Sequence, residues 1–70
     1  MSTVPVDQRV MDDLRELVEA WGEDPQRFTP WEQQFCRDLN EKIHRWGSSI
    51  LVSPNQYEQV ERMLEEKVRV

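Results

Sequence analysis

Residues 29–47 read TPWEQQFCRDLNEKIHRWG, and they contain the start, the body and the end of one α-helix. Thr29 and Glu32 have the spacing of a capping box, in which the threonine hydroxyl caps an amide and the glutamate reaches back to the cap residue. Pro30 stands at the first helical position, where its missing N–H costs nothing. The closing glycine is a typical helix stop. The stretch therefore predicts a helix over residues 30–46.

The same capping pattern returns later in the chain as Ser53-Pro54-Asn55-Gln56. The apolar residues that follow it recur at helical spacing, as Tyr57, Val60, Leu64 and Val68. We therefore expect a helix over residues 54–68.

The first part of the chain has a weaker start signal but the most regular apolar pattern. Its apolar residues are Val6, Val10, Met11, Leu14, Leu17, Val18 and Trp21. Their spacing traces a face slightly wider than a coiled-coil seam. We expect a helix over residues 6–21, ended by Gly22.

These three segments predict a single all-α domain over residues 1–70, with an amphipathic N-terminal helix followed by a helical hairpin and no sheet. Residues 50–52 are too apolar for an ordinary loop, so we expect them to lie extended over the core. Trp31 and Phe35 lie on the apolar line of the second helix and are expected in the core. Trp21 and Trp46 each precede a glycine and could keep one face exposed, which makes them the better interface residues.

The composition excludes several kinds of functional site. With one cysteine and one histidine, it predicts neither an intrachain disulfide nor a Cys/His zinc site. Cys36 and His44 are eight residues apart on one predicted helix, about 12 Å along its axis, which is too far for a nucleophile and its base. Only two glycines are present, which excludes a glycine-rich phosphate loop. We therefore predict no catalytic residues, no metal and no cofactor.

No apolar run resembles a secretory signal or approaches the roughly 18 residues of a membrane span, so we expect a cytoplasmic protein without membrane contact. The net charge of −5 disfavours nucleic acid as a partner. The alternative of a DNA-associated accessory factor would use Arg37, Lys42 and Arg45 on the second helix. The connection over 47–53 is longer than the turn of a helix-turn-helix, which disfavours this alternative further.

We instead expect another protein chain as the partner. The predicted partner-binding residues are Leu14, Leu17, Val18, Trp21 and Trp46. The first four would anchor the acidic, amphipathic first helix on a basic-rimmed groove of a target. The same apolar face could instead pack inside the chain or pair with its copy in a homodimer, which would merge two thin cores.

From residue 28 onward the chain resembles a short helical hairpin of small proteins from phages and other mobile elements. The pattern is Leu/Phe-Thr/Ser-x-Trp-Glu-x-x-Phe, a glycine after the helix, and then Leu-x-Ser-x-x-Gln. The matching residues are Phe28, Thr29, Trp31, Glu32, Phe35, Gly47, Leu51, Ser53 and Gln56. Trp46 and Pro54 depart from the pattern, and the first 27 residues have no counterpart in it.

The resemblance implies a phage-type origin, and every matched residue serves folding. We therefore expect a non-enzymatic regulator that binds a host protein and covers a site which that protein needs. Two alternatives remain open at this point: the DNA-associated factor, and a structural subunit that only assembles with itself or with a larger complex.

Overall fold

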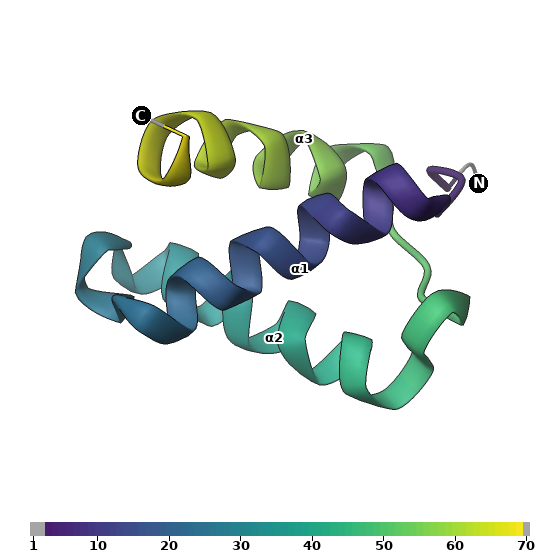
Figure 1. The fold of residues 1–70 in the computed structure, drawn as a ribbon, viewed down its shortest axis with the longest axis horizontal. Coiled ribbons are helices and arrows are strands. Elements are labelled where there is room, and N and C mark those ends of the chain that lie inside the picture. Colours follow the sequence, from purple (N-terminus) through teal and green to yellow (C-terminus); the bar gives the residue numbers. More distant parts are fainter. Residues whose placement is uncertain (1–2, 70) are drawn as a thin grey trace.

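Three α-helices make up most of residues 3–69, the part of the chain described by the computed structural model (Figure 1). α1 spans Gln8–Glu23, α2 spans Pro30–Trp46 and α3 spans Pro54–Met63. Within the described residues there is no strand or sheet, which confirms the all-α three-helix prediction. Residues 1–2 and 70, which the predicted domain includes, lie outside this description.

Both predicted capping boxes are present. The Thr29 hydroxyl accepts from the Glu32 N–H at 3.2 Å, and the Glu32 carboxylate accepts from the Thr29 N–H at 2.9 Å. Ser53 and Gln56 make the same pair of bonds at 3.1 and 3.0 Å. Gly47 ends α2 with a φ of 56°, a backbone conformation that suits glycine. The bounds of α2 and the start of α3 therefore match the prediction.

The bounds of α1 differ from the prediction at both ends. The helix starts two residues later than expected because Asp7 is the cap, and its carboxylate accepts from the Val10 N–H at 2.9 Å. Gly22 does not end the helix, since glycine weakens a helix by only about 1 kcal/mol. Asp24 ends it instead, with a φ of −145° and a ψ of 77°. The following Pro25 disfavours helical geometry at this residue.

The last part of the third predicted helix changes its hydrogen bonding. After α3, the chain continues as a π-helical turn over Leu64–Val68, and the Arg69 N–H donates to the Leu64 carbonyl at 2.7 Å. The range 54–68 is therefore helical throughout, as expected, but its last five residues are wound more widely.

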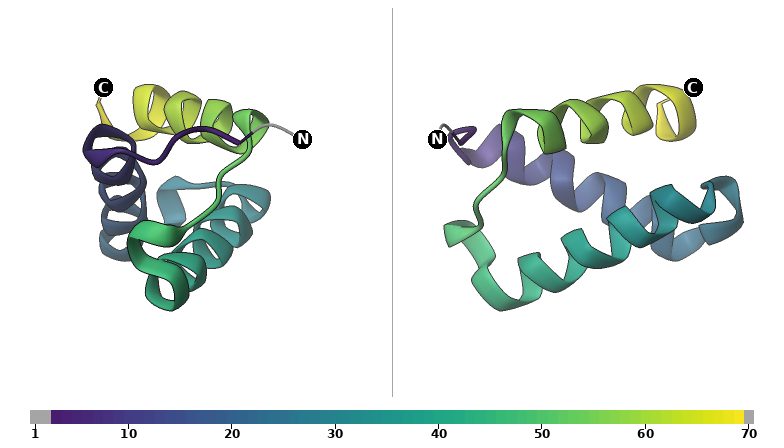
Figure 2. Two further views of the ribbon diagram at one scale, coloured as in Figure 1. Left: turned by 90° about the vertical axis from the view of Figure 1, so that its right-hand side faces the viewer. Right: turned by 180° about the vertical axis from the view of Figure 1, so that it is seen from behind.

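α1 lies across one side of the molecule and packs against both other helices. α2 and α3 touch each other far less, and they diverge toward the end where residues 50–53 join them (Figures 1 and 2). The segment before α1 lies beside this connection, and its Val4 N–H donates to the Val52 carbonyl at 2.8 Å. The side away from α1 is therefore the open side of the bundle.

The core is built from medium-sized side chains, and none of the three tryptophans is among its buried members. Its buried apolar residues are Val10, Met11, Leu14, Leu17, Phe28, Cys36, Leu39, Ile50, Val52, Val60, Met63 and Leu64. Trp31 and Trp46 are each 56% exposed. The core position expected for Trp31 is therefore wrong, Trp46 is exposed as expected, and Trp21 is half-buried against the core.

In the connection between α2 and α3, successive side chains alternate between the core and the surface. Ile50 and Val52 are buried, whereas Leu51 between them is 71% exposed. Successive side chains of an extended segment point to opposite sides, so two of these three apolar residues can reach the core. The expectation of an extended segment over the core is confirmed, and the remaining leucine is left on the surface.

Candidate functional site

The predicted docking residues of α1 are mostly inside the protein. Leu14 and Leu17 have no exposed surface, so a partner of the folded chain does not reach them. Val18 and Trp21 are half-buried and pack against the same core. The apolar face of α1 therefore packs inside the chain. The sequence had left this possibility open, together with docking on a target and pairing in a homodimer. For Leu14 and Leu17 the docking prediction is therefore corrected.

The large exposed apolar side chains among residues 3–69 are Trp31, Trp46 and Leu51. The sequence predicted Trp46 as an interface residue and Trp31 as a core residue. The error for Trp31 has a geometric cause. Each step of four residues turns about 40° around a helix, so the line from Trp31 to Ile43 winds through roughly 120°. Trp31, its first member, faces outward, whereas Phe35 is half-buried against the core and Leu39 is buried.

Five residues of α2 share one face, on which Trp31, Asp38 and Trp46 are exposed and Phe35 and Lys42 are half-buried. Taking 100° per residue, they fall within an arc of roughly 80°. They are Trp31, Phe35, Asp38, Lys42 and Trp46, and we call them the α2 stripe. The rings of Trp31 and Phe35 pack on each other, with centroids 5.5 Å apart and planes tilted by 30°. The two rings thus form one continuous aromatic surface at the start of the stripe.

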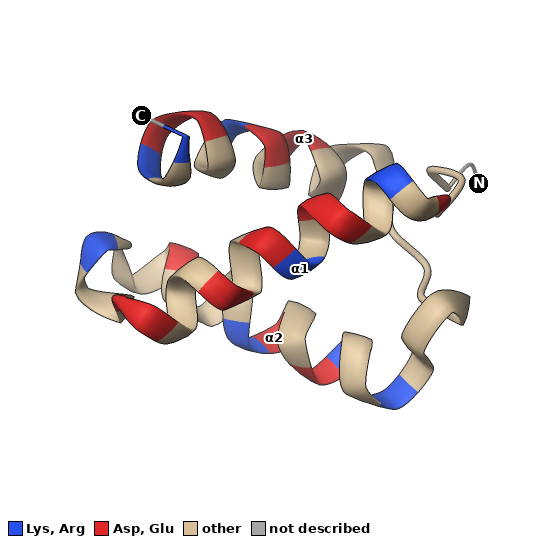
Figure 3. Ribbon diagram, in the orientation of Figure 1, with Lys and Arg blue, Asp and Glu red and all other residues tan. Residues whose placement is uncertain are grey.

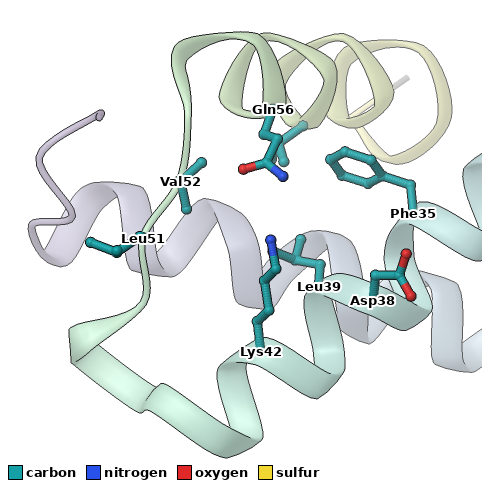
Figure 4. Close-up of a pocket in the computed structure, with 8 residues that line it drawn as sticks. Phe35, Asp38, Leu39, Lys42, Leu51, Val52 and Gln56 are labelled. Atoms are coloured by element: carbon teal, nitrogen blue, oxygen red, sulfur yellow. The ribbon is translucent and has the colours of Figure 1, made fainter. Parts of the chain in front are cut away.

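Beside the middle of the stripe, a cavity of about 180 Å³ opens between α2 and α3 (Figure 4). Phe35 and Lys42 point into it from α2, and Gln56 faces them from α3. Val52 and Val60 form part of its apolar lining. The volume is below the roughly 300 Å³ at which small-molecule sites begin, and it suits a single apolar side chain of a partner.

A second hollow, of about 430 Å³, lies at the C-terminal end of the stripe. Lys42, Trp46, Ser49 and Leu51 line it. Lys42 and Leu51 border both hollows, so the two are continuous along the same side of the molecule. The exposed Leu51, which the sequence did not single out for binding, thereby extends the apolar surface beyond α2.

The basic residues of the DNA alternative do not form one patch. Arg37 and Lys42 stand roughly 140° apart around α2. Glu41 stands four residues after Arg37 and four before Arg45, so a carboxylate lies between the two guanidinium groups on their face. Phosphate binding relies on a concentration of unopposed positive charge. This arrangement does not favour it.

The acidic side of α1 is partly neutralised by the C-terminal residues of the chain. Arg69 Nη2 lies 2.9 Å from an Asp13 carboxylate oxygen and 2.8 Å from one of Glu16. The hydrogen bond from Arg69 is the main cause that lowers the pKa of Glu16. Asp12, Glu19 and Glu23 remain exposed. Acidic residues follow one another along the side of α1 that faces the viewer in Figure 3, away from the open side of the bundle.

Cys36 and His44 lie in different environments. Cys36 is fully buried, and burial together with the neighbouring Glu32 charge raises its pKa to about 12. A thiolate is the reactive form of cysteine, so this thiol is held in its unreactive form. His44 is exposed, with Nδ1 2.9 Å from the Asn40 carbonyl oxygen. The α2 stripe, and not this pair, is the surface that suggests a function.

Among the described residues, no group of three or more His, Cys, Asp or Glu side chains is placed to hold a metal ion. No helix in residues 3–69 is both long enough and apolar enough to cross a membrane. Comparison with known proteins finds no matching family model, no significantly similar curated protein and no significantly similar solved structure.

Proposed function

We propose that the protein is a non-enzymatic regulator that binds another protein chain through the α2 stripe and the adjoining Leu51. Its mechanism is occlusion, in which the aromatic surface covers a site that the target needs. The observation that carries the proposal is the exposure of Trp31, Trp46 and Leu51 along one side of the molecule. The binding surface is thus on α2, and the first helix supports it from inside.

The residue types of this surface suit protein binding. Tryptophan is enriched among the residues that contribute most to interface affinity, and such residues cluster in pockets surrounded by polar groups. Trp46 borders a hollow, and Trp31 stacks on Phe35. Asp38 and Lys42 supply polar groups at the centre of the stripe. Exposed apolar side chains clustered beside polar groups are typical of an interaction site.

The charge distribution suits a folded protein target better than nucleic acid. Residues 29–53 hold three acidic and three basic side chains, so the stripe lies in an electrically balanced part of the chain. The excess negative charge is concentrated in residues 1–28, with seven acidic and three basic side chains. Affinity for the target should therefore come from apolar burial and depend only weakly on salt.

The proposal retains the setting suggested by the sequence, which is a host protein in the cytoplasm as target of a phage-type regulator. Its support is the resemblance of residues 28–56 to phage hairpins. In the structure, Trp31 and Leu51 of that resemblance are exposed together with Trp46. A pattern whose residues serve folding thus also includes two large apolar side chains on the surface.

Photocrosslinking tests this proposal directly. A photoreactive phenylalanine analogue replaces Trp46 in one sample and Glu19, on the exposed face of α1, in the matched control. Both are irradiated in nuclease-treated host lysate, and the adducts are identified by mass spectrometry. We expect a discrete protein adduct from position 46 and none from position 19. The same adducts from both positions, or none from position 46, would refute the proposed surface.

A further inference from the structure

Two hydrogen-bond donors meet in the cavity between α2 and α3 without an acceptor. The amino group of Lys42 and the amide nitrogen of Gln56 point toward each other from opposite sides of this cavity (Figure 4). Gln56 Oε1 already accepts from the Ser53 N–H at 3.0 Å, so Nε2 is the free end of the amide. Within residues 3–69, neither nitrogen has a hydrogen-bond acceptor or a salt-bridge partner. An oxygen atom between the two nitrogens would accept from both.

The rest of the cavity is mainly apolar. Phe35, Leu39, Val52 and Val60 form its walls, and the last three of these side chains are buried. An apolar cavity of about 150 Å³ is large enough to hold benzene, so the 180 Å³ found here accommodates one branched or aromatic group. A ligand that complements both parts of the cavity therefore carries an apolar group next to acceptor oxygens.

The charge of Lys42 indicates which acceptor fits best. Asp38 also lines the cavity, but its carboxylate lies on the Phe35 side and accepts from Gln34 Nε2 at 3.0 Å (Figure 4). It forms no salt bridge with Lys42, so this half-buried ammonium group is left for a ligand. Hydrogen bonds between an ammonium group and a carboxylate are about twice as strong as those between neutral groups. A carboxylate, with two oxygens, satisfies Lys42 and Gln56 together.

We propose that this cavity binds the C-terminal residue of a protein chain whose last side chain is apolar and whose carboxylate is free. The side chain fills the apolar part of the cavity, and the carboxylate lies between Lys42 and Gln56. The inference rests on the proposed function, because it names the part of the target that binds beside the α2 stripe. Capture of a terminal carboxylate is an established mode of peptide recognition.

The second hollow favours a chain end over a small carboxylic acid. Lys42 and Leu51 border both hollows, and Trp46 lines the second one. The residues that precede the terminal residue therefore have an apolar surface to follow, across the exposed side chains of Trp46 and Leu51. A small acid would contact the first hollow alone. The chain end thus uses surface that the acid cannot reach.

The first experiment titrates the full ¹⁵N-labelled chain at neutral pH with acetyl-Ala-Ala-Leu, which has a free C-terminal carboxylate. We expect saturable shifts of the Val52 and Gln56 amide signals, with a Kd on the order of 1 mM or lower. The same peptide with a C-terminal amide is the matched control and should bind at least about tenfold more weakly. Isocaproate, which carries the same branched group on a carboxylate, should also bind more weakly than the peptide.

The second experiment removes each donor while keeping the local structure. Lys42→Met retains most of the side-chain length without the charge and should weaken binding of the free peptide at least about tenfold. Arg37→Met makes the same charge change on another face of α2 and should have no effect. Gln56→Glu keeps an oxygen to cap Ser53 but replaces the donor by a negative charge, so it should abolish binding. Gln59→Glu, the control on α3, should leave binding unchanged. Circular dichroism confirms that each variant is folded.

The outcomes separate this inference from the proposed function. Equal affinities for the free and the amidated peptide, or for wild type and Lys42→Met, overturn the carboxylate site. Isocaproate that binds as tightly as the peptide overturns the assignment to a chain end. If no peptide binds while position 46 still gives a specific protein adduct, the target binds through another segment, and only this inference fails. If the peptides bind as expected but position 46 gives no adduct in lysate, the proposed function fails and the carboxylate site stands.

Discussion

Lys67 Nζ lies 3.4 Å from Glu32 Oε1, which joins the π-helical turn at the C-terminal end to the first turn of α2. Glu32 is 4% exposed and is the one charged residue that is buried within residues 3–69. Its carboxylate also caps the Thr29 N–H and lies 3.7 Å from Arg62 Nη1. Lys67 in turn donates to the Arg27 carbonyl, and Arg27 Nη1 donates to the Lys67 carbonyl at 2.8 Å. A capping residue thus becomes the centre of a tertiary contact.

Replacing Glu32 should destabilise the fold through this contact. Glu32→Ala removes half of the capping box and leaves Lys67 without its buried partner, so we expect a loss of about 1–3 kcal/mol in the free energy of unfolding. Urea denaturation measures this change. Glu66→Ala, which removes an exposed partner of Arg62, is the matched control and should cost about 0.5 kcal/mol or less. Equal losses in the two variants would contradict the role given to Glu32.

The same carboxylate should make the stability of the protein depend on pH. Burial acts to raise the pKa of Glu32, but the hydrogen bonds from Thr29 and the Lys67 charge outweigh it and leave the pKa below 4.5. Its stabilisation is therefore present above pH 4.5 and is lost as the pH falls through the lower value of the folded state. Glu32→Gln should flatten the stability profile in this acidic range, measured by urea denaturation at a series of pH values. An unchanged slope would show that other carboxylates, such as Glu16, account for the fall.

Tyr57 should contribute to stability until strongly alkaline pH. Its hydroxyl donates to Asp13 Oδ2 at 2.7 Å, and this hydrogen bond is the main cause that raises the pKa of Tyr57 to about 12. The contribution is complete below pH 10 and disappears as the pH rises toward 12. Tyr57→Phe should cost about 0.5–1.5 kcal/mol at neutral pH. Ultraviolet titration of the single tyrosine checks the pKa, and a midpoint near 10 would contradict the contact.

Trp46 and Leu14 should behave in opposite ways when truncated. Trp46→Ala removes an exposed side chain and should change the free energy of unfolding by about 0.5 kcal/mol or less in dilute solution. Leu14→Ala empties part of the core and should cost about 2–5 kcal/mol. Thermal denaturation compares the two variants. Binding, measured on protein that circular dichroism shows to be folded, should fall with Trp46→Ala alone, and a loss only with Leu14→Ala would return the binding site to α1.

Cys36 should react with thiol reagents only when the protein unfolds. Its side chain has no exposed surface, and its pKa of about 12 leaves almost no thiolate at neutral pH. We expect the reaction with a chromogenic disulfide to be at least about a hundredfold slower in the native protein than in concentrated urea. The rate in urea is the internal control. A fast native reaction would show that the core around α2 opens readily.

The starts of α2 and α3 and the end of α2 could be predicted because their causes are local. Thr29, Ser53 and Gly47 act on neighbouring backbone groups, whatever the rest of the chain does. α1 ends two residues later than predicted, because Gly22 does not end it and the restriction that Pro25 places on Asp24 does. The all-α class followed from apolar spacing alone.

Only part of the proposed binding surface could be predicted, because α2 carries two apolar lines and the sequence does not say which one faces inward. The line through Cys36 and Leu39 is buried, whereas Trp31 and Trp46 stay outside. The outward placement of Leu51 depends in the same way on Ile50 and Val52 reaching the core.

The sequence by itself determined where α2 and α3 begin, which residues cap them and the all-α class, because caps and periodicity act within a few residues. The tertiary structure decided that α1 packs inward along Leu14 and Leu17, that Lys67 contacts Glu32, and that Trp31 and Trp46 of α2 remain exposed. The physical reason is that burial depends on how distant segments pack together. A tryptophan on the second helix belongs to the core or to the surface only according to where α1 and α3 come to lie.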